Sequence, residues 1–240
     1  MVEFTVLTYN AGNWRAKPDR LVAALESMNA DLIGLQELSH AQAEAIAGGL
    51  AAAYPHQAMF PGGFAGKAVL SRFPILRSEQ LYLGPERPDL LCEIDMGIEP
   101  LTLIAAHPPP PIVRLKGFGF HPATWAQIQA LVALAVEKSP SILLGDFNLI
   151  DQQQEYRYLQ SAGLGDAFLE AGSGPGKTLP RRLGPWKRFT TFHRLISWLP
   201  LLPMLRVDYI WHTASLRALQ AWVGADAGSD HLPVLAKFAM

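Results

Sequence analysis

Short apolar runs alternate with segments of helical periodicity along the whole chain, and this alternation predicts a single α/β or α+β domain over residues 1–240. Pro18–Met28 places its leucines on one helix face and has a proline in its first turn. Asp31–Leu38 has the nearly continuous apolar character of a buried strand, and Ser39 after it is a suitable N-cap for an alanine-rich helix. The other expected strands are Phe4–Tyr9, Lys67–Arg72, Leu91–Met96, Leu101–His107, Ser141–Asn148, Arg206–Thr213 and His231–Phe238, and the other expected helices are 123–138 and one capped by Asp151 that runs through Gln160.

The composition excludes several classes of protein. Of the 240 residues, 50% are hydrophobic and 17% are charged, so the chain can bury a core without disulfides, and disordered or fibrous classes are excluded. The formal net charge is -1, so any contact with a polyanion depends on a local basic patch. Cys92 is the single cysteine, which rules out an internal disulfide and a cysteine-cluster zinc site.

Neither end of the chain nor its apolar runs predict membrane insertion. The sequence begins on a strand-like pattern without a basic or apolar leader, so no signal peptide is expected. The longest apolar run, Leu195–Leu205, contains two prolines and is shorter than the roughly 20 residues of a membrane-spanning helix. We therefore expect a cytoplasmic protein, and a domain cut from a longer, membrane-anchored protein is the alternative.

Polar side chains recur where the apolar strands end, which is where layered α/β proteins build their sites. Asp146 and Asn148 lie two residues apart after a buried run, so in extended geometry both point the same way. Asp208 is the only charge in an apolar segment and needs a partner, which a nearby histidine would supply. The candidate site residues are Asn10, Glu37, His107, Asp146, Asn148, Asp208, Asp230 and His231.

The oxygen-rich side chains among these candidates favour a hard divalent cation, and a histidine and cysteine set of the zinc type is absent. Mg²⁺ or Mn²⁺ is therefore the expected cofactor. Such a site suits hydrolysis of a phosphate ester, because the cation neutralises phosphoryl charge while a carboxylate orients water. Amide and imidazole groups can then donate hydrogen bonds to the transition state, so no side-chain nucleophile is required.

At these residues the sequence resembles the endonuclease/exonuclease/phosphatase superfamily, whose fold is that of deoxyribonuclease I. The resemblance implies a four-layer α/β sandwich, in which two mixed β-sheets pack face to face with helices on the outside. The proline run after His107 resembles that of a bacterial subset whose substrates are poorly defined, and Gly12 departs from the acidic residue common in abasic-site endonucleases. Seven motifs in the family's order carry the resemblance: Leu-Thr-Tyr-Asn10, Leu-Gln-Glu37, residues 66–74, Ala-His107, Leu-Gly-Asp146-Phe-Asn148, Arg-Val-Asp208-Tyr-Ile and Gly-Ser-Asp230-His231-Leu-Pro.

The same resemblance implies a metal site in which Glu37 is the principal ligand and Asn10 and Asp230 assist it. Each residue also has a plainer interpretation when it is taken alone. Asn10 could satisfy its own backbone in a turn, and Glu37 could be a surface cap or a salt-bridge partner.

For the reacting groups, the resemblance implies that Asp146 orients or deprotonates the attacking water. Asn148 and His107 would bind phosphate oxygens. His231, paired with Asp208, would act on the phosphate or as a proton donor or acceptor. A lone histidine such as His107 is also common as a satisfied structural residue, which is its plainer interpretation.

A basic stretch lies between Glu170 and Asp208, where the sequence has no acidic residue and seven of its 20 cationic residues. Its plainest interpretation is a solvated loop. Functionally, its basic and aromatic side chains could follow a nucleic-acid backbone, or together with Leu195–Leu205 they could contact an anionic membrane surface. The candidate substrate-binding residues in it are Arg181, Arg182, Lys187 and Arg188.

The function expected from the sequence is a Mg²⁺- or Mn²⁺-dependent phosphodiesterase that acts by metal-assisted water attack, and specifically a nuclease that binds and cleaves DNA. A phospholipid, sphingomyelin-type or small-molecule phosphoesterase is the alternative. A non-catalytic binding module on the same fold would be expected to lack one of the site residues, whereas all of them are present here.

Overall fold

The computed structural model describes residues 2–84, 86–114, 117–151, 153–181 and 201–240, which form two six-stranded sheets and five α-helices. The first sheet has the order β13 (Arg217–Val223), β14 (Val234–Ala239), β1 (Glu3–Asn13), β2 (Leu32–Leu38), β4 (Lys67–Ser71) and β3 (His56–Phe60). The second has the order β11 (Gly165–Asp166), β12 (Asp208–His212), β10 (Ser141–Asp146), β7 (Pro100–Ala106), β6 (Asp89–Asp95) and β5 (Ile75–Leu81). The helices are α1 (Pro18–Met28), α2 (His40–Gly49), α3 (Pro122–Glu137), α4 (Gln154–Ser161) and α5 (Ala167–Ala171), and β8 (Ile112–Arg114) and β9 (Gly117–Gly119) form a separate hairpin.

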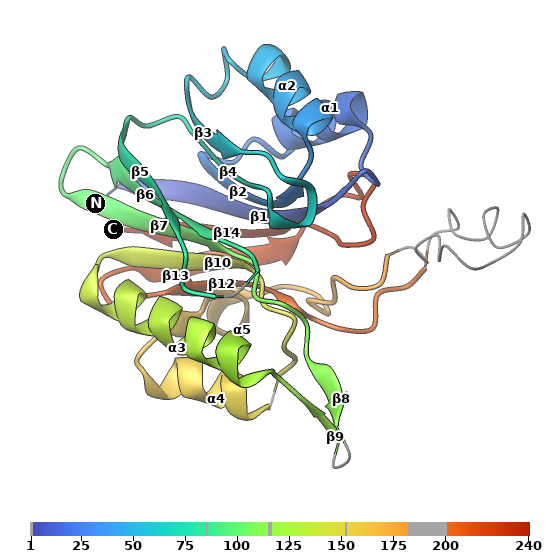
Figure 1. Cartoon of the computed structure of the whole chain (residues 1–240). Coiled ribbons are helices and arrows are strands. Elements are labelled where there is room, and N and C mark those ends of the chain that lie inside the picture. The colour runs from blue at the N-terminus through green and yellow to red at the C-terminus, as the bar shows by residue number, and fades with distance from the viewer. Residues whose placement is uncertain (1, 85, 115–116, 152, 182–200) are drawn as a thin grey trace, which may run out of the picture.

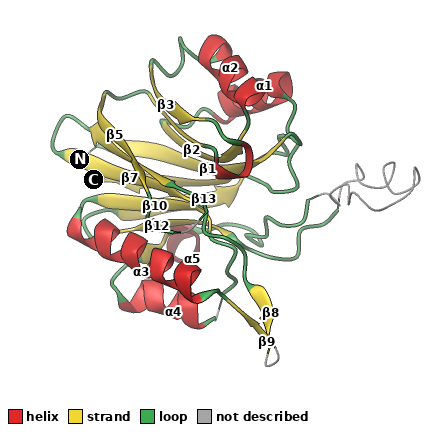
Figure 2. Cartoon of the chain, viewed as in Figure 1, coloured by secondary structure: helices red, strands yellow, loops and turns green. Residues whose placement is uncertain are grey.

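The elements stack in four layers (Figure 1). Helices α1 and α2 cover the first sheet, α3 and α4 cover the second, and the two sheets lie between the helices (Figure 2). Both sheets are mixed, because β1 runs parallel to β2 and β7 runs parallel to β10 while their other neighbours are antiparallel. The expected four-layer α/β sandwich is confirmed. Among the described residues, no helix combines the length and apolar character needed to cross a bilayer.

Alternation along the strands builds three hydrophobic layers. In β1, Phe4 and Val6 face the core between the sheets, whereas Leu7 and Tyr9 face the layer under α1 and α2. The sheets approach closely at Gly34, where an added Cβ would lie 2.2 Å from the Cδ1 atom of Leu144 on the opposite sheet. A larger residue at this position would therefore push the sheets apart.

Several sequence predictions match the observed elements closely. The helix α1 spans the predicted Pro18–Met28, and Ser39 caps α2 by accepting a hydrogen bond from the backbone N–H of Gln42 in a capping box. The hydrophobic pattern does not predict β3, β5 or β13. All three are edge strands, and in β5 four consecutive residues are exposed, so this strand lacks the apolar run of a central strand.

The predicted cap at Asp151 is wrong. The helix α4 begins at Gln154, and Gln153 occupies its N-cap position. The Asp151 carboxylate instead accepts hydrogen bonds from Arg206 at 2.8 and 3.0 Å and from the Tyr209 hydroxyl at 2.9 Å. The Asp151 side chain therefore pairs with a residue distant in the sequence, although the local sequence predicts that it caps the helix.

Arg206 is a buried cation that joins three segments of the second sheet and its helices. Its guanidinium donates to Asp166, which is itself buried and caps α5, and its Cζ atom lies 4.8 Å from the centroid of the Tyr209 ring. Two carboxylates and an aromatic face thus replace its hydration shell.

Replacing Arg206 with Met is expected to lower the free energy of unfolding by about 3–5 kcal/mol, because buried Asp166 loses its counter-charge. Urea denaturation measures the change. Arg77→Met is the matched control, since Arg77 pairs with Glu79 on an exposed strand and its loss should cost less than about 1 kcal/mol. Equal losses for the two variants would show that the buried network adds nothing.

Candidate active site

Four strands deliver polar side chains into the space between the sheets at one edge. The residues that face the opposite sheet include Val6 in β1, Ala105 in β7, Leu144 in β10 and Ile210 in β12. The polar residues of the site lie on the same face of these strands, two or four residues closer to this edge. These are Asn10, His107, Asp146 and Asp208, and all four are buried.

Glu37 reaches the same space by a break in strand alternation. Ile33 and Leu35 of β2 face the helices, and regular alternation would turn Glu37 the same way. Its φ of +54° is a left-handed conformation that non-glycine residues rarely adopt. The carboxylate instead lies with its Oε1 atom 3.4 Å from Asn10 Nδ2 and 3.8 Å from His107 Nε2.

Asp146 lies at the centre of a polar cluster that consists of Asn10, Glu37, His107, Asp146, Asp208 and His231. Its Oδ2 atom lies 3.0 Å from Asn10 Nδ2, 3.4 Å from His107 Nε2 and 3.7 Å from His231 Nε2. Burial raises the pKa of Asp146, but the charge of His231 and the hydrogen bonds from His107 and Asn10 outweigh it and hold that pKa below its usual range. Asp146 is therefore an ionised carboxylate at neutral pH.

Asn148 follows Asp146 in a turn rather than in a continued strand. Its φ is +53°, its backbone N–H donates to Asp146 Oδ1 at 3.0 Å, and its side-chain amide donates to the carbonyl of Pro108 at 3.1 Å. The amide thereby ties the end of β10 to the segment after His107, and its second N–H remains available for a ligand.

Asp208 and His231 form a buried pair. His231 Nδ1 lies 2.9 Å from Asp208 Oδ2, so the aspartate orients the ring and directs Nε2 toward Asp146. Burial lowers the pKa of His231, but Asp208 and Asp146 outweigh it and raise that pKa to about 9. His231 is therefore a cationic donor at neutral pH, and it is the partner that an isolated Asp208 requires.

Replacing Asp208 with Asn is expected to move the alkaline limb of the pH–rate profile downward by about one to three pH units. Wild-type activity should fall as pH rises through about 9, where His231 loses its proton. Without the Asp208 charge, His231 deprotonates at lower pH. The matched control is Glu170→Gln, which removes the carboxylate 3.0 Å from His212 outside the cluster. An alkaline limb that stays in place would contradict the role of the pair.

Asp230 stands apart from the other candidates. Its carboxylate forms an ion pair with Arg15 and accepts a hydrogen bond from the Ser229 hydroxyl at 3.2 Å. The Arg15 guanidinium in turn lies over the Trp14 ring, with 5.6 Å between Cζ and the ring centroid. To bind a metal, the Asp230 carboxylate would therefore have to exchange its contact with Arg15 for the cation.

Two further cations at the cluster escaped the sequence reasoning. Arg87 Nη1 lies 2.6 Å from His107 Nε2, and burial, together with the charges of Arg87 and Lys67, lowers the pKa of His107 against the pull of Asp146. Lys67 is buried in β4, and desolvation lowers its pKa to about 8. A charged residue at the very start of an apolar strand was the available signal for Lys67, whereas Arg87 lies in a loop with no such signal.

Of the four candidate substrate-binding cations, only Arg181 lies in the described residues. Its backbone N–H donates to the carbonyl of Asp230 at 2.5 Å, which places it beside the site, while its guanidinium bonds to Asp226 and to the carbonyl of Leu201. Arg182, Lys187 and Arg188 lie outside the described residues, as does the part of Leu195–Leu205 before residue 201.

The residues of the cluster fit a hard divalent cation by their donor chemistry. Asp146, Asp208 and His231 bring three potential ligand atoms within 4.8 Å of one another, but a protonated His231 cannot ligate through its ring. The carboxylates of Glu37 and Asp146 supply oxygen ligands of the kind that Mg²⁺ or Mn²⁺ prefers. Asn10 turns its Nδ2 atom toward both carboxylates, and its Oδ1 atom accepts from the backbone N–H of Gly12 at 2.9 Å.

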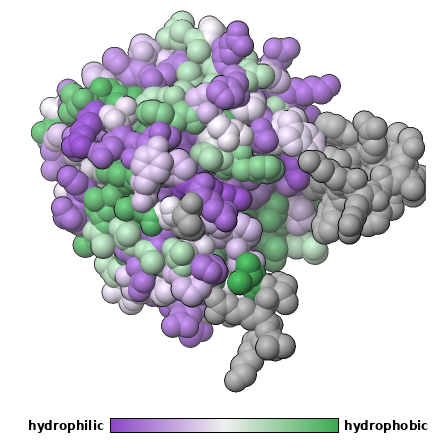
Figure 3. Space-filling view, in the orientation of Figure 1, coloured by the Kyte–Doolittle hydropathy of each residue, from purple (hydrophilic) through white to green (hydrophobic). Residues whose placement is uncertain are grey.

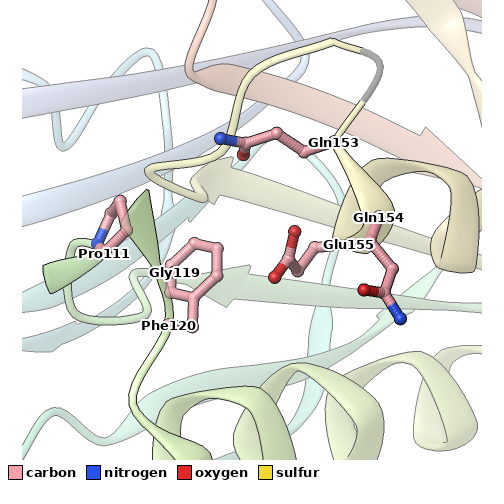
Figure 4. A pocket seen from close by; sticks show the side chains of 6 residues that line it. All are labelled: Pro111, Gly119, Phe120, Gln153, Gln154 and Glu155. Carbon is pink, nitrogen blue, oxygen red and sulfur yellow. The ribbon is translucent and has the colours of Figure 1, made fainter. Parts of the chain in front are cut away.

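A separate hollow lies between the β8–β9 hairpin and the start of α4 (Figure 4). None of the candidate site residues lines it, so it is distinct from the polar cluster. Its lining consists of Pro111, Gly119, Phe120, Gln153, Gln154 and Glu155.

Comparisons with known proteins agree with this architecture. Protein YbhP of Escherichia coli (strain K12) is 28% identical over 271 residues, which cover 98% of this chain and 95% of YbhP. The structure of D. rerio TDP2 complexed with single strand DNA product matches with a TM-score of 0.72 at 16% identity, covering 100% of both chains. A mannosyl-6-phosphatase from Bacteroides thetaiotaomicron matches with a TM-score of 0.67 at 18% identity, covering 99% of this chain and 100% of that one.

These structural matches show a shared fold, and a family model extends the relation to the sequence. The model of the Endonuclease/Exonuclease/phosphatase family matches residues 7–231, a span that contains every residue of the polar cluster. The chain therefore belongs to the endonuclease/exonuclease/phosphatase family.

Proposed function

We propose that this protein hydrolyses phosphate diesters with the help of bound Mg²⁺ or Mn²⁺. The observation that carries the proposal is the position of Asp146, an ionised carboxylate within 3.0–3.7 Å of Asn10, His107 and His231. It combines a fixed negative charge, which can hold water, with neighbouring donors that can hold an anion. Members of the family are phosphoesterases or nucleases, which supports the same reaction class.

Glu37 would hold the cation, which when bound neutralises charge on the phosphoryl oxygens. Asn10 would assist it through Oδ1, which has to exchange its bond with the Gly12 N–H for the cation. The low pKa of Asp146 makes it a weak base, so its main task is to accept a hydrogen bond from the attacking water and orient it. His231, protonated and fixed by Asp208, donates from Nε2 to the phosphoryl group. Asn148 and His107 supply further hydrogen bonds to phosphoryl oxygens.

Three substrate classes are supported by different observations. The resemblance in sequence favours DNA, and the fold shared with TDP2, which was crystallised with a single strand DNA product, supports it. A lipid phosphodiester is supported instead by the exposed side chains of Leu202 and Met204, in a segment that pairs with the chain beside Asp230. A small phosphate ester, the third class, is supported by the mannosyl-6-phosphatase that shares this fold.

The test is turnover of a soluble chromogenic diester, plasmid DNA, a short RNA and sphingomyelin vesicles, each with Mg²⁺, Mn²⁺ or EDTA. We expect EDTA-sensitive hydrolysis of the soluble diester and of one natural class. Activity that persists in EDTA would contradict metal dependence, and no hydrolysis of any diester by the folded protein would overturn the proposed reaction.

A further inference from the structure

A short arm extends from the sandwich beside the active site (Figure 1). It consists of residues 178–181 and 201–205, which pair through hydrogen bonds between the backbones of Leu179 and Leu205 at 2.8 and 3.0 Å. On its inner side the arm pairs with the turn that carries Asp230 and His231, since Leu232 N donates to the carbonyl of Thr178 at 3.0 Å. The outer limb therefore lies two strand spacings, about 10 Å, from the site.

The outer limb exposes large apolar side chains. Leu202 is 87% exposed and Met204 is 68% exposed, and Leu202 is the most exposed large hydrophobic residue in the described part of the chain. Trp14, 52% exposed, lies on the same side of the site, because its neighbour Arg15 pairs with Asp230, which is itself bonded to Arg181. Single large apolar side chains are exposed elsewhere too, Tyr82 and Ile98 among them, and on the face shown in Figure 3 apolar and polar residues are interspersed.

The charged residues in the sequence around the arm are all basic. From Ala171 to Val207 there is no acidic residue, and the chain between the two limbs of the arm carries Arg182, Lys187, Arg188 and Arg194. Leucine, methionine and tryptophan side chains next to cationic residues are the combination that proteins use at anionic bilayer surfaces.

We propose that the arm and Trp14 seat this protein on an anionic phospholipid bilayer, so that lipid phosphodiester headgroups reach the site. This inference rests on the proposed function and names its substrate class. Leu202 and Met204 would enter the acyl boundary while the headgroups, about 10 Å away across the paired limbs of the arm, lie opposite Asp146 and His231. A bilayer fits better than DNA, because aliphatic tips do not stack on bases and the described Arg181 is already paired with Asp226.

The experiment compares the wild type with the double variant Leu202→Asp/Met204→Asp in sedimentation with phosphatidylcholine vesicles containing phosphatidylglycerol. The matched control, Leu76→Asp/Ile98→Asp, changes residues 56% and 63% exposed at the opposite end of the second sheet. We expect the wild type and the control to bind equally, and the arm variant to bind at least about tenfold more weakly. All three should hydrolyse a soluble chromogenic diester at the same rate.

Other outcomes overturn the inference. One is that the wild type does not bind the vesicles, and the other is that the arm variant binds them as strongly as the wild type does. Loss of oligonucleotide binding in the arm variant, with vesicle binding unchanged, would make the arm a nucleic-acid contact instead. Failure of the proposed function has a different signature, because it would abolish metal-dependent hydrolysis of the soluble diester in all three proteins.

Discussion

Replacing Asp146 with Asn is expected to lower turnover at least about a hundredfold, with little change in melting temperature. The amide keeps the shape of the side chain but only one acceptor oxygen, so it keeps either the bond from Asn10, now made to Oδ2, or the bond from the backbone of Asn148, now made to Oδ1. It loses the negative charge that orients the attacking water. The measurement is kcat for the soluble diester at saturating metal, together with thermal unfolding.

The control for this variant is Asp95→Asn. Asp95 ends β6 at the opposite end of the second sheet, where it accepts a hydrogen bond only from the backbone of Gly97 among the described contacts. This change should leave kcat at the wild-type level. Unchanged turnover in Asp146→Asn would remove Asp146 from the mechanism, and a large drop in melting temperature would reassign it to folding.

Replacing Glu37 with Gln is expected to raise the Mg²⁺ concentration for half-maximal activity at least about tenfold, because a hard cation loses a charged oxygen ligand. The amide preserves the length of the side chain and makes no new demand on the left-handed backbone at this position. Activity titrated against Mg²⁺ measures the shift, and calorimetric titration of the metal alone provides a readout that does not depend on catalysis.

Glu44→Gln on the exposed face of α2 is the isosteric control and should not move the midpoint. An unaltered midpoint in Glu37→Gln would be incompatible with its role as a ligand. A lower kcat at saturating Mg²⁺, with the midpoint unchanged, would instead place Glu37 among the residues that orient the substrate.

Much of the site was predictable because a polar residue follows the apolar run of several of its strands. Asp146 and Asp208 interrupt apolar segments in the sequence, and their registers pair them directly in adjacent strands. The clustering itself was not predictable from local pattern, since Asn10 and Asp146 are 136 residues apart and belong to different sheets. The prediction that these residues form one site came instead from the resemblance to the family, whose motifs occur in the same order along this chain.

The misses share one cause, which is that tertiary partners override local preference. Asp151 was predicted as a helix cap but binds Arg206, a residue 55 positions away. Arg87 lies in a loop without periodicity, and only the packing of that loop against His107 brings it to the cluster. The ion pair between Asp230 and Arg15 likewise depends on tertiary packing, and the role of Asp230 at the site stays a prediction.

The sequence by itself determined the central strands, the bounds of α1, the cap of α2 and the identity of the polar residues at the strand termini. Such features depend on apolar periodicity and on capping within a few residues, which short stretches of chain decide alone. Only the tertiary structure decided which ends meet, how Glu37 turns toward the space between the sheets, and that His231 stays protonated. Those properties arise from burial and from charges contributed by distant strands, and neither exists until the two sheets pack together.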